Sequence, residues 1–146
     1  MQYIIFYTRY VLAHAETTGT PMFVLTLDFQ HAFGRISQQY LFHILQRYGL
    51  SPWFVEFIHA LYDQATVSVQ INGSLSSSIP IWSGVRKGCP LSVALFALCL
   101  HPLITTLEHS LPSIKLGRHK QYGPVIACDD DVTVFITNPG DFHAIQ

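Results

Sequence analysis

The spacing of apolar residues predicts helices in several parts of the chain. Four segments have a helical pattern: residues 2–16, 38–48, 52–62 and 91–109. Ser37 can cap the second helix, and Gly49 is a suitable stop at its end. Ser51-Pro52 opens the third, because proline is favoured at the first helical position. We expect Pro102 to kink or break the fourth.

Three other segments favour strands. "MFVLTLDF" (22–29) is apolar on both faces and is therefore expected to be a central strand. "TVSVQING" (66–73) and "SSSIPIWSG" (76–84) form a hairpin around Asn72-Gly73. "GPVIACDDDVTVFITN" (123–138) forms two short strands with an acidic turn, and Asp141 could start a further helix. This order predicts an α+β fold, with a mostly antiparallel sheet packed on helices.

The composition limits the kind of protein. The 146 residues suffice for one domain with a core, and a hydrophobic content of 49% excludes a disordered chain. The charged content of 12% is below the roughly 25% usual for soluble domains, so other protein segments are expected to cover part of the apolar surface. A net charge of −1 gives no global basic field for nucleic acid.

Cysteines and apolar runs indicate an intracellular protein without a membrane segment. The three cysteines form no CxxC pair and are expected to be reduced thiols. The longest apolar run, ten residues from Leu91, is too short to span a bilayer, and the start lacks the basic region of a signal peptide. The eight histidines show no zinc-binding spacing.

Two acidic features could carry chemistry. Asp129, Asp130 and Asp131 stand in a row between two apolar runs, although aspartate is depleted in strands and adjacent carboxylates repel one another. Asp28 closes the apolar strand "FVLTLD". If the two acidic strand ends lie side by side, Asp28 comes near Asp130 and their oxygens suit Mg²⁺. The alternative is that Asp28 only ends a strand or caps a turn.

A third feature is the loop "SGVRKGCPLS" (83–92) directly before a helix. Its glycines and proline constrain the backbone, and Arg86 and Lys87 add positive charge. The backbone N–H groups of such a loop could face a phosphate or a base pair.

Taken together, three segments resemble the palm motifs of reverse transcriptases in order and spacing. They are "LTLDFQHAFGRIS", "SGVRKGCPLSVALFALCLHPL" and "ACDDDVTVFI". The match is closest to non-LTR (LINE-type) retrotransposons and covers roughly residues 2–142. The resemblance implies a reverse-transcriptase palm with part of the fingers and without the thumb. Residues 1–146 would then be a partial reverse transcriptase domain, truncated at both ends.

The resemblance also implies roles for individual residues. Asp28, Asp130 and Asp131 match the catalytic aspartates, with Asp28 and Asp130 as direct ligands of two Mg²⁺ ions, Asp131 in support and the Phe29 carbonyl as a further ligand. A second group of residues is expected to contact the incoming nucleotide: the His31 and Ala32 N–H groups at the triphosphate, Phe33 against a ribose 2′-OH, and Lys87, Gly88 and Pro90 in the loop beside the base pair.

The implied activity is RNA-templated DNA synthesis, with an RNA template, a DNA primer and dNTPs as partners. Five positions depart from the family pattern: Gly34, Lys87, Val93, Cys128 and Asp129. These departures indicate a decaying mobile-element copy that is inactive as this chain. Two alternatives remain. One is a non-catalytic retroelement relic with at most weak RNA binding. The other is a metal-dependent nuclease or phosphatase, which would have no need of "GVRKGCPLS" or Phe33.

Overall fold

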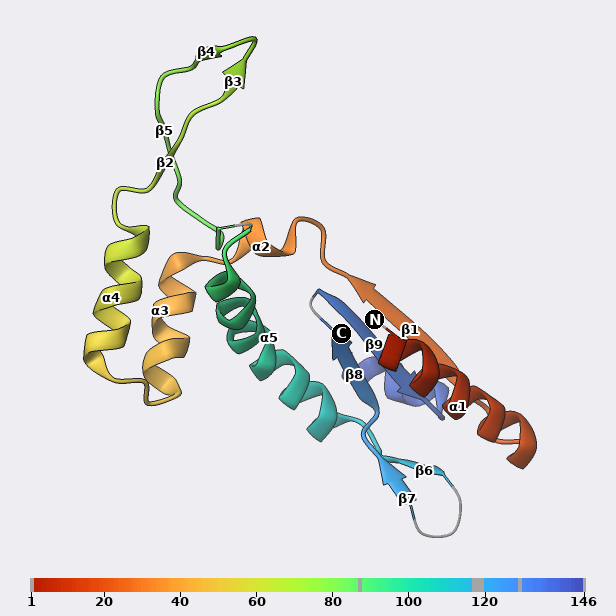
Figure 1. Ribbon diagram of the computed structural model, residues 1–146. Coiled ribbons are helices and arrows are strands. Elements are labelled where there is room, and N and C mark those ends of the chain that lie inside the picture. Colours follow the sequence, from red (N-terminus) through yellow and green to blue (C-terminus); the bar gives the residue numbers. More distant parts are fainter. Residues whose placement is uncertain (1, 87, 117–119, 129, 146) are drawn as a thin grey trace. The chain divides into compact units, whose positions relative to one another are not determined.

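The computed structural model describes residues 2–86, 88–116, 120–128 and 130–145, and these divide into two compact units. Unit 1 comprises residues 1–30 and 100–146, and unit 2 comprises residues 31–99. The helices and antiparallel strands within the units confirm the predicted α+β class (Figure 1).

Unit 1 is built on a three-stranded antiparallel sheet in the order β1-β9-β8. Its strands are β1 (Phe23–Asp28), β8 (Val125–Cys128) and β9 (Asp131–Ile136). The unit also contains α1 (Gln2–Thr18), the C-terminal part of α5 (Pro90–Ser110), the hairpin of β6 (Ile114–Leu116) and β7 (Lys120–Tyr122), and the 3-10 helix η1 (Pro139–Ala144).

The central strand of this sheet is β9, and the prediction that residues 22–29 form a central strand was wrong. Among the described residues, β1 pairs only with β9 and lies at the edge of the sheet. Its residues alternate between exposed and half-buried, whereas five consecutive residues of β9, Val132 to Ile136, are buried. The segments of β1 and β9 are both apolar, but β9 is hydrogen-bonded to a strand on each side, and it is therefore the central strand.

The sheet has an apolar layer on each face. Val132, Val134 and Ile136 of β9 pack with Leu107 of α5 and with Leu111. Because side chains alternate along a strand, Phe135 lies on the other face, where it packs with Val11 of α1 and Ile114. The sheet is therefore held between α1 and the C-terminal part of α5.

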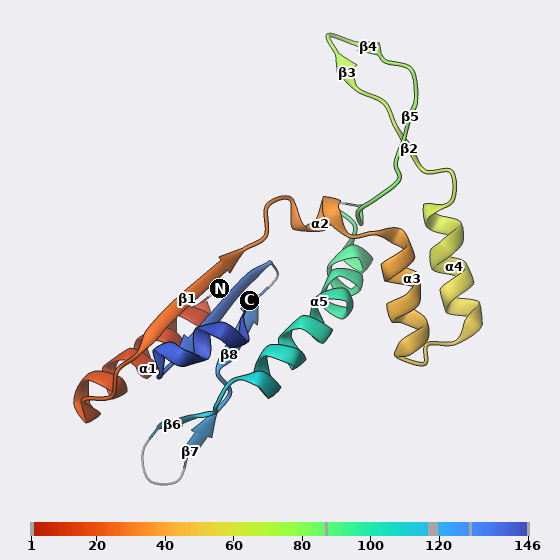
Figure 2. The same cartoon turned by 180° about the vertical axis from the view of Figure 1, so that it is seen from behind.

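Unit 2 contains a helical pair and a long twisted ribbon. Its helices are α2 (Ala32–Arg35), α3 (Gln38–Arg47), α4 (Pro52–Tyr62) and the N-terminal part of α5. Its strands are β2 (Thr66–Val67), β3 (Gln70–Ile71), β4 (Ser74–Leu75) and β5 (Ile79–Pro80). Figure 2 shows α3 and α4 side by side, with the ribbon of β2 to β5 extending away from them.

Local signals placed these elements correctly. The Ser37 side chain accepts a hydrogen bond from the Tyr40 N–H, which confirms the predicted cap. The helix expected to open at Ser51-Pro52 begins at Pro52, and Ser51 accepts a hydrogen bond from the Phe54 N–H. The expected hairpin turns at Asn72 and Gly73, whose φ values of 48° and 83° fit a two-residue turn. It forms as two short ladders, β2 with β5 and β3 with β4.

The helix α5 continues through Pro102, so of the two expected effects of this proline, a kink or a break, the break does not occur. Proline removes one helical hydrogen bond, and packing on either side of it outweighs this loss: Leu95 and Phe96 are buried before it, and Leu107 is buried after it.

By length and mean hydropathy (1.8), α5 could cross a membrane, which the ten-residue apolar run did not indicate. Burial raises the pKa of the Cys99 thiol in this helix to about 11.

Candidate active site

The ends of β1 and β9 bring two of the predicted catalytic residues together. In the antiparallel register, Asp28 at the end of β1 is directly opposite Asp131 at the start of β9. Directly opposed residues project to the same face of a sheet with Cβ atoms about 4.5–5.5 Å apart. Both aspartates are exposed, so the pair presents two carboxylates at one corner of the sheet.

The remaining residues of the predicted metal site lie close by in sequence. Asp130 is half-buried in the turn between β8 and β9, and Asp129 lies outside the described residues. Phe29 directly follows Asp28, and its ring packs against the core of unit 1. The register pairs Asp28 with Asp131, and the direct-ligand role expected for Asp130 stays a prediction. Within the described part of the chain, no group of three or more potential ligands is assembled.

A groove of about 380 Å³ lies on the same sheet face as the Asp28–Asp131 pair. It is lined by Asp131 and Thr133 of β9, Thr26 of β1, and Thr8 and Arg9 of α1. No role for Arg9 was predicted from the sequence. A signal was present, since Arg9 is the only Lys, Arg, Asp or Glu among residues 2–15 of a mainly apolar helical segment.

In unit 2, the segment that follows Asp28 is joined to the "SGVRKG" loop by hydrogen bonds that are mostly between main-chain atoms. Three hydrogen bonds link the two segments: Val85 N–H to Phe33 O (2.7 Å), Gly84 N–H to Ile36 O (2.7 Å) and Ser83 Oγ to Gly34 O (3.1 Å). An isolated β-bridge between Ser37 and Ser83 continues this contact. Two motifs about fifty residues apart in sequence thus form one local structure, which we call the motif junction (residues 33–37 and 83–85).

Gly84 makes the motif junction possible. Its φ of +89° is one that side chains rarely adopt, and a Cβ atom there would lie 2.8 Å from the Gly34 Cα and 2.9 Å from the Phe33 oxygen. A Cβ at Gly34, by contrast, would meet no atom within 4 Å. The close approach of the two segments therefore requires glycine at position 84, whereas position 34 has room for a side chain.

The residues expected to contact a nucleotide triphosphate adopt distinct local conformations. His31 has a left-handed backbone (φ 55°, ψ 38°) immediately before α2, and Ala32 is buried. The half-buried ring of Phe33 stacks on Phe96 of α5, with centroids 4.5 Å apart and planes 17° apart. This stacking fixes the ring of Phe33, and the roles of all three residues toward a nucleotide stay predictions.

The loop before α5 contains the other predicted nucleotide contacts. Gly88 has a φ of +81° with open space around it, Pro90 is the first residue of α5, and Lys87 lies outside the described residues. Next to them, hydrogen bonds from the Leu91 and Ser92 backbone lower the pKa of the Cys89 thiol.

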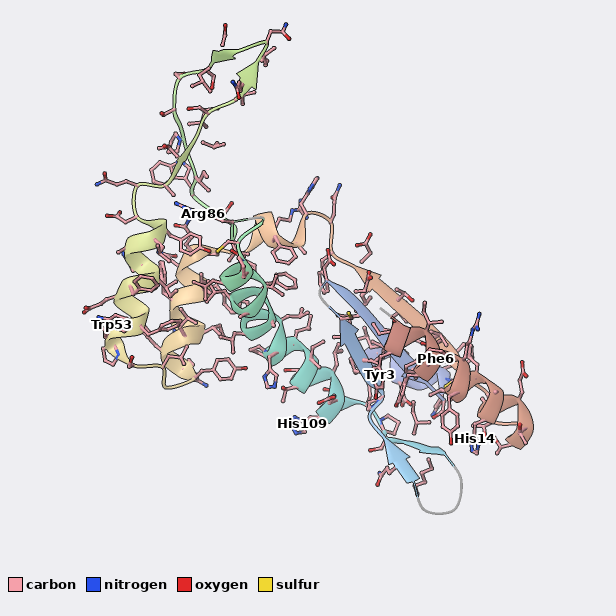
Figure 3. All side chains as sticks on the ribbon, in the orientation of Figure 1. Tyr3, Phe6, His14, Trp53, Arg86 and His109 are labelled. Carbon is pink, nitrogen blue, oxygen red and sulfur yellow. The ribbon has the colours of Figure 1, made fainter. Side chains whose placement is uncertain are left out.

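Arg86, which adds positive charge to this loop, also makes a structural contact. Its Nη2 donates a hydrogen bond to the Leu61 carbonyl (3.0 Å), near the C-terminal end of α4 (Figure 3). A cation at this position is favourable, because the last carbonyls of a helix carry partial negative charge.

The fold and these motifs define a class of polymerase. Residues 3–146 match the family model described as reverse transcriptase (RNA-dependent DNA polymerase), and the chain belongs to this family. The apo telomerase of Candida tropicalis, truncated from the C-terminal domain, has a similar fold. The TM-score is 0.63 at 15% sequence identity, and the similarity covers 94% of this chain and 29% of that one.

The curated relatives are retrotransposon proteins. The uncharacterized 149 kDa protein of transposon TX1 from Xenopus laevis is 34% identical over 142 residues, covering 97% of this chain and 11% of that protein. The Pol polyprotein of retrotransposable element R2DM from Drosophila melanogaster is 28% identical over 125 residues, covering 86% and 12%. The predicted resemblance is thereby confirmed: this is a reverse transcriptase domain of a non-LTR retrotransposon. It spans about a tenth of the length of these relatives.

Proposed function

We propose that the chain is the catalytic part of an RNA-directed DNA polymerase that adds dNTPs to a primer 3′-OH inside the cell. The observation that carries this proposal is the direct opposition of Asp28 and Asp131 on neighbouring strands. Family membership supports nucleic acid as the substrate. An RNA template and a DNA primer would be its partners, together with the fingers and thumb segments of the full-length protein.

The chemistry of the opposed aspartates fits a divalent cation. Two like charges placed directly opposite each other destabilise a sheet, and a bound cation removes this repulsion. Asp28 and Asp130, with the Phe29 carbonyl, would hold two Mg²⁺ ions, and Asp131 would support them, since hard cations prefer oxygen ligands. When bound, the ions would stabilise the charge on the attacking and leaving oxygens of phosphoryl transfer.

The chain's own residues would bind and orient the nucleotide. The N–H groups of His31 and Ala32 would donate to its triphosphate, and Phe33, held by Phe96, would block a ribose 2′-OH. Lys87, Gly88 and Pro90 would lie against the new base pair. Holding the reactants in the reactive orientation would supply a large part of the rate enhancement.

Magnesium binding tests this assignment without requiring activity. We expect about 10 mM MgCl₂ to raise the thermal midpoint of the chain, because a ligand that binds only the folded state stabilises it. Asp28→Asn should remove most of this shift, Asp131→Asn should reduce it, and Glu56→Gln on α4 should leave it unchanged. In EDTA, either aspartate variant should equal or exceed the parent in stability, because one like charge is gone. A Mg²⁺-induced shift that survives in both variants would refute the site.

We further propose that this chain, by itself, does not synthesise DNA. Gly34, Lys87, Cys128 and Asp129 stand at motif positions where the family pattern has other residues. We expect dNTP incorporation on a primed RNA template with Mg²⁺ to equal that of an Asp28→Ala control. Incorporation clearly above the control would show that these departures are compatible with catalysis.

The same departures favour a second candidate function, a non-catalytic retroelement relic with at most weak RNA binding. The magnesium experiment separates the two candidates. A relic that has lost its metal site would show no Mg²⁺-dependent stabilisation, and the parent chain would then behave like its Asp28→Asn variant.

A further inference from the structure

A cavity of about 660 Å³ in unit 2 has no assigned role. It lies where α3, α4 and the base of the β2–β5 ribbon meet. Its lining includes three glutamines, a histidine, an aspartate and a tryptophan: Gln38, Gln39, Gln64, His59, Asp63 and Trp82. We call it the ribbon-base cavity.

The polar groups of the ribbon-base cavity do not suit a phosphate. No lysine or arginine is among the described residues that line it, and Asp63 adds a negative charge. Asp63 follows the last residue of α4, where the helix dipole disfavours a carboxylate, so helix stability does not explain its position. A carboxylate and three side-chain amides are instead suited to the N–H donors and carbonyl acceptors of a nucleobase.

Parts of the cavity wall are fixed before any ligand binds. The Gln38 side chain donates to the Ile81 carbonyl (3.4 Å), which ties α3 to the ribbon. The rings of Phe42 and His59 lie against each other, with centroids 4.7 Å apart, and so join α3 to α4. A preformed wall reduces the entropic cost of binding.

Trp82 is the most unusual residue of this site. Its side chain is 80% exposed, although indole is a large apolar group that normally covers or enters a core. The other tryptophan, Trp53 on α4 (Figure 3), is also exposed, but its ring stacks on Phe57 with an angle of 10° between the planes. Exposed aromatic rings next to a recess are used by proteins that bind single-stranded nucleic acid, because every base can stack on them.

We propose that the ribbon-base cavity binds one base of a single-stranded nucleic acid, while Trp82 stacks against the neighbouring base. The sugar-phosphate backbone would remain outside, away from the carboxylate of Asp63. The proposal rests on the nucleic-acid substrate of the proposed function and adds a binding site for the unpaired strand in unit 2.

Because the chain contains two tryptophans, each can be observed alone. Trp53→Phe leaves Trp82 as the only indole, and Trp82→Phe leaves Trp53. We expect single-stranded RNA of about 10 nucleotides to quench the Trp82 fluorescence in a saturable manner, as base stacking on an indole does. The Trp53 fluorescence should not change. Single-stranded DNA of the same sequence distinguishes a general base site from one that recognises the 2′-OH.

Affinity measurements complete the test. By anisotropy of a labelled oligonucleotide, Trp82→Ala should weaken binding about tenfold, because stacking on one aromatic ring contributes about 1–3 kcal/mol per base. Asp63→Ala in the Trp53→Phe background should weaken it several-fold, with an unchanged thermal midpoint as the check on folding. Trp53→Ala is the matched control and should have no effect.

Three results would overturn the proposal: no change in Trp82 fluorescence, an equal change at Trp53, or unchanged affinity in both the Trp82→Ala and Asp63→Ala variants. All binding is measured in EDTA, so it does not depend on the metal site. A normal Trp82 response with no Mg²⁺-dependent stabilisation would refute the proposed function alone.

Discussion

Gly84→Ala is expected to lower the free energy of unfolding by about 3 kcal/mol or more, from backbone strain together with a steric clash. The alanine Cβ would require a φ near +89° and would lie 2.8–2.9 Å from main-chain atoms of Phe33 and Gly34. Because these are backbone atoms, no side-chain rotation can relieve the clash. The motif junction would have to open, with loss of the hydrogen bonds from Gly84 and Val85.

Gly73→Ala is the matched control for this substitution. Gly73 has a similar φ of +83°, but a Cβ there would meet nothing within 4 Å. It should therefore cost only the conformational term of about 1 kcal/mol. Urea denaturation of the three proteins measures both effects. Equal losses in the two variants would mean that the close approach at Gly84 is not a stabilising feature.

Phe135→Ala should have a comparable or larger effect, a loss of about 3–5 kcal/mol. Phe135 is 1% exposed on the central strand and packs with Val11 and Ile114. Its ring also meets Tyr7 edge to face at 5.6 Å. Removing the ring would leave a cavity between β9 and α1, and the surrounding side chains could fill it only in part.

The comparison is Phe23→Ala on the neighbouring strand. Phe23 is 39% exposed and contacts Phe142, so its removal should cost about 1 kcal/mol. Denaturant midpoints followed by circular dichroism give both values. Similar losses from Phe23→Ala and Phe135→Ala would mean that burial between β9 and α1 does not make Phe135 more important for stability than the exposed Phe23.

Elements with local signals were predictable from the sequence. Ser37 and Ser51 mark the starts of two helices through hydrogen bonds to residues three positions later, and Asn72-Gly73 marks a turn by its backbone preference. These interactions join residues close in sequence, so the residue types alone reveal them. The acidic turn and the order of the palm motifs were recognisable for the same reason.

Features that depend on distant partners were not predictable. The apolar pattern of residues 22–29 could not show that β9 would take the central position, because both segments are apolar. Pro102 is tolerated because of the packing on either side of it. The short β6–β7 hairpin has no clear alternation. The groove at Arg9 and the ribbon-base cavity combine residues from separate elements, and only the folded chain reveals them.

The motif junction determines which substitutions this part of the chain can accept without losing its local structure. Most of its hydrogen bonds come from main-chain atoms, which mutation of the side chains does not remove. Position 34, where the family pattern has an aspartate, carries glycine here, and the junction is still formed. Side chains of these motif segments can therefore change while the main-chain architecture of the junction is kept. Within the junction, substitution is least tolerated at Gly84, because a Cβ atom there would clash with main-chain atoms of Phe33 and Gly34.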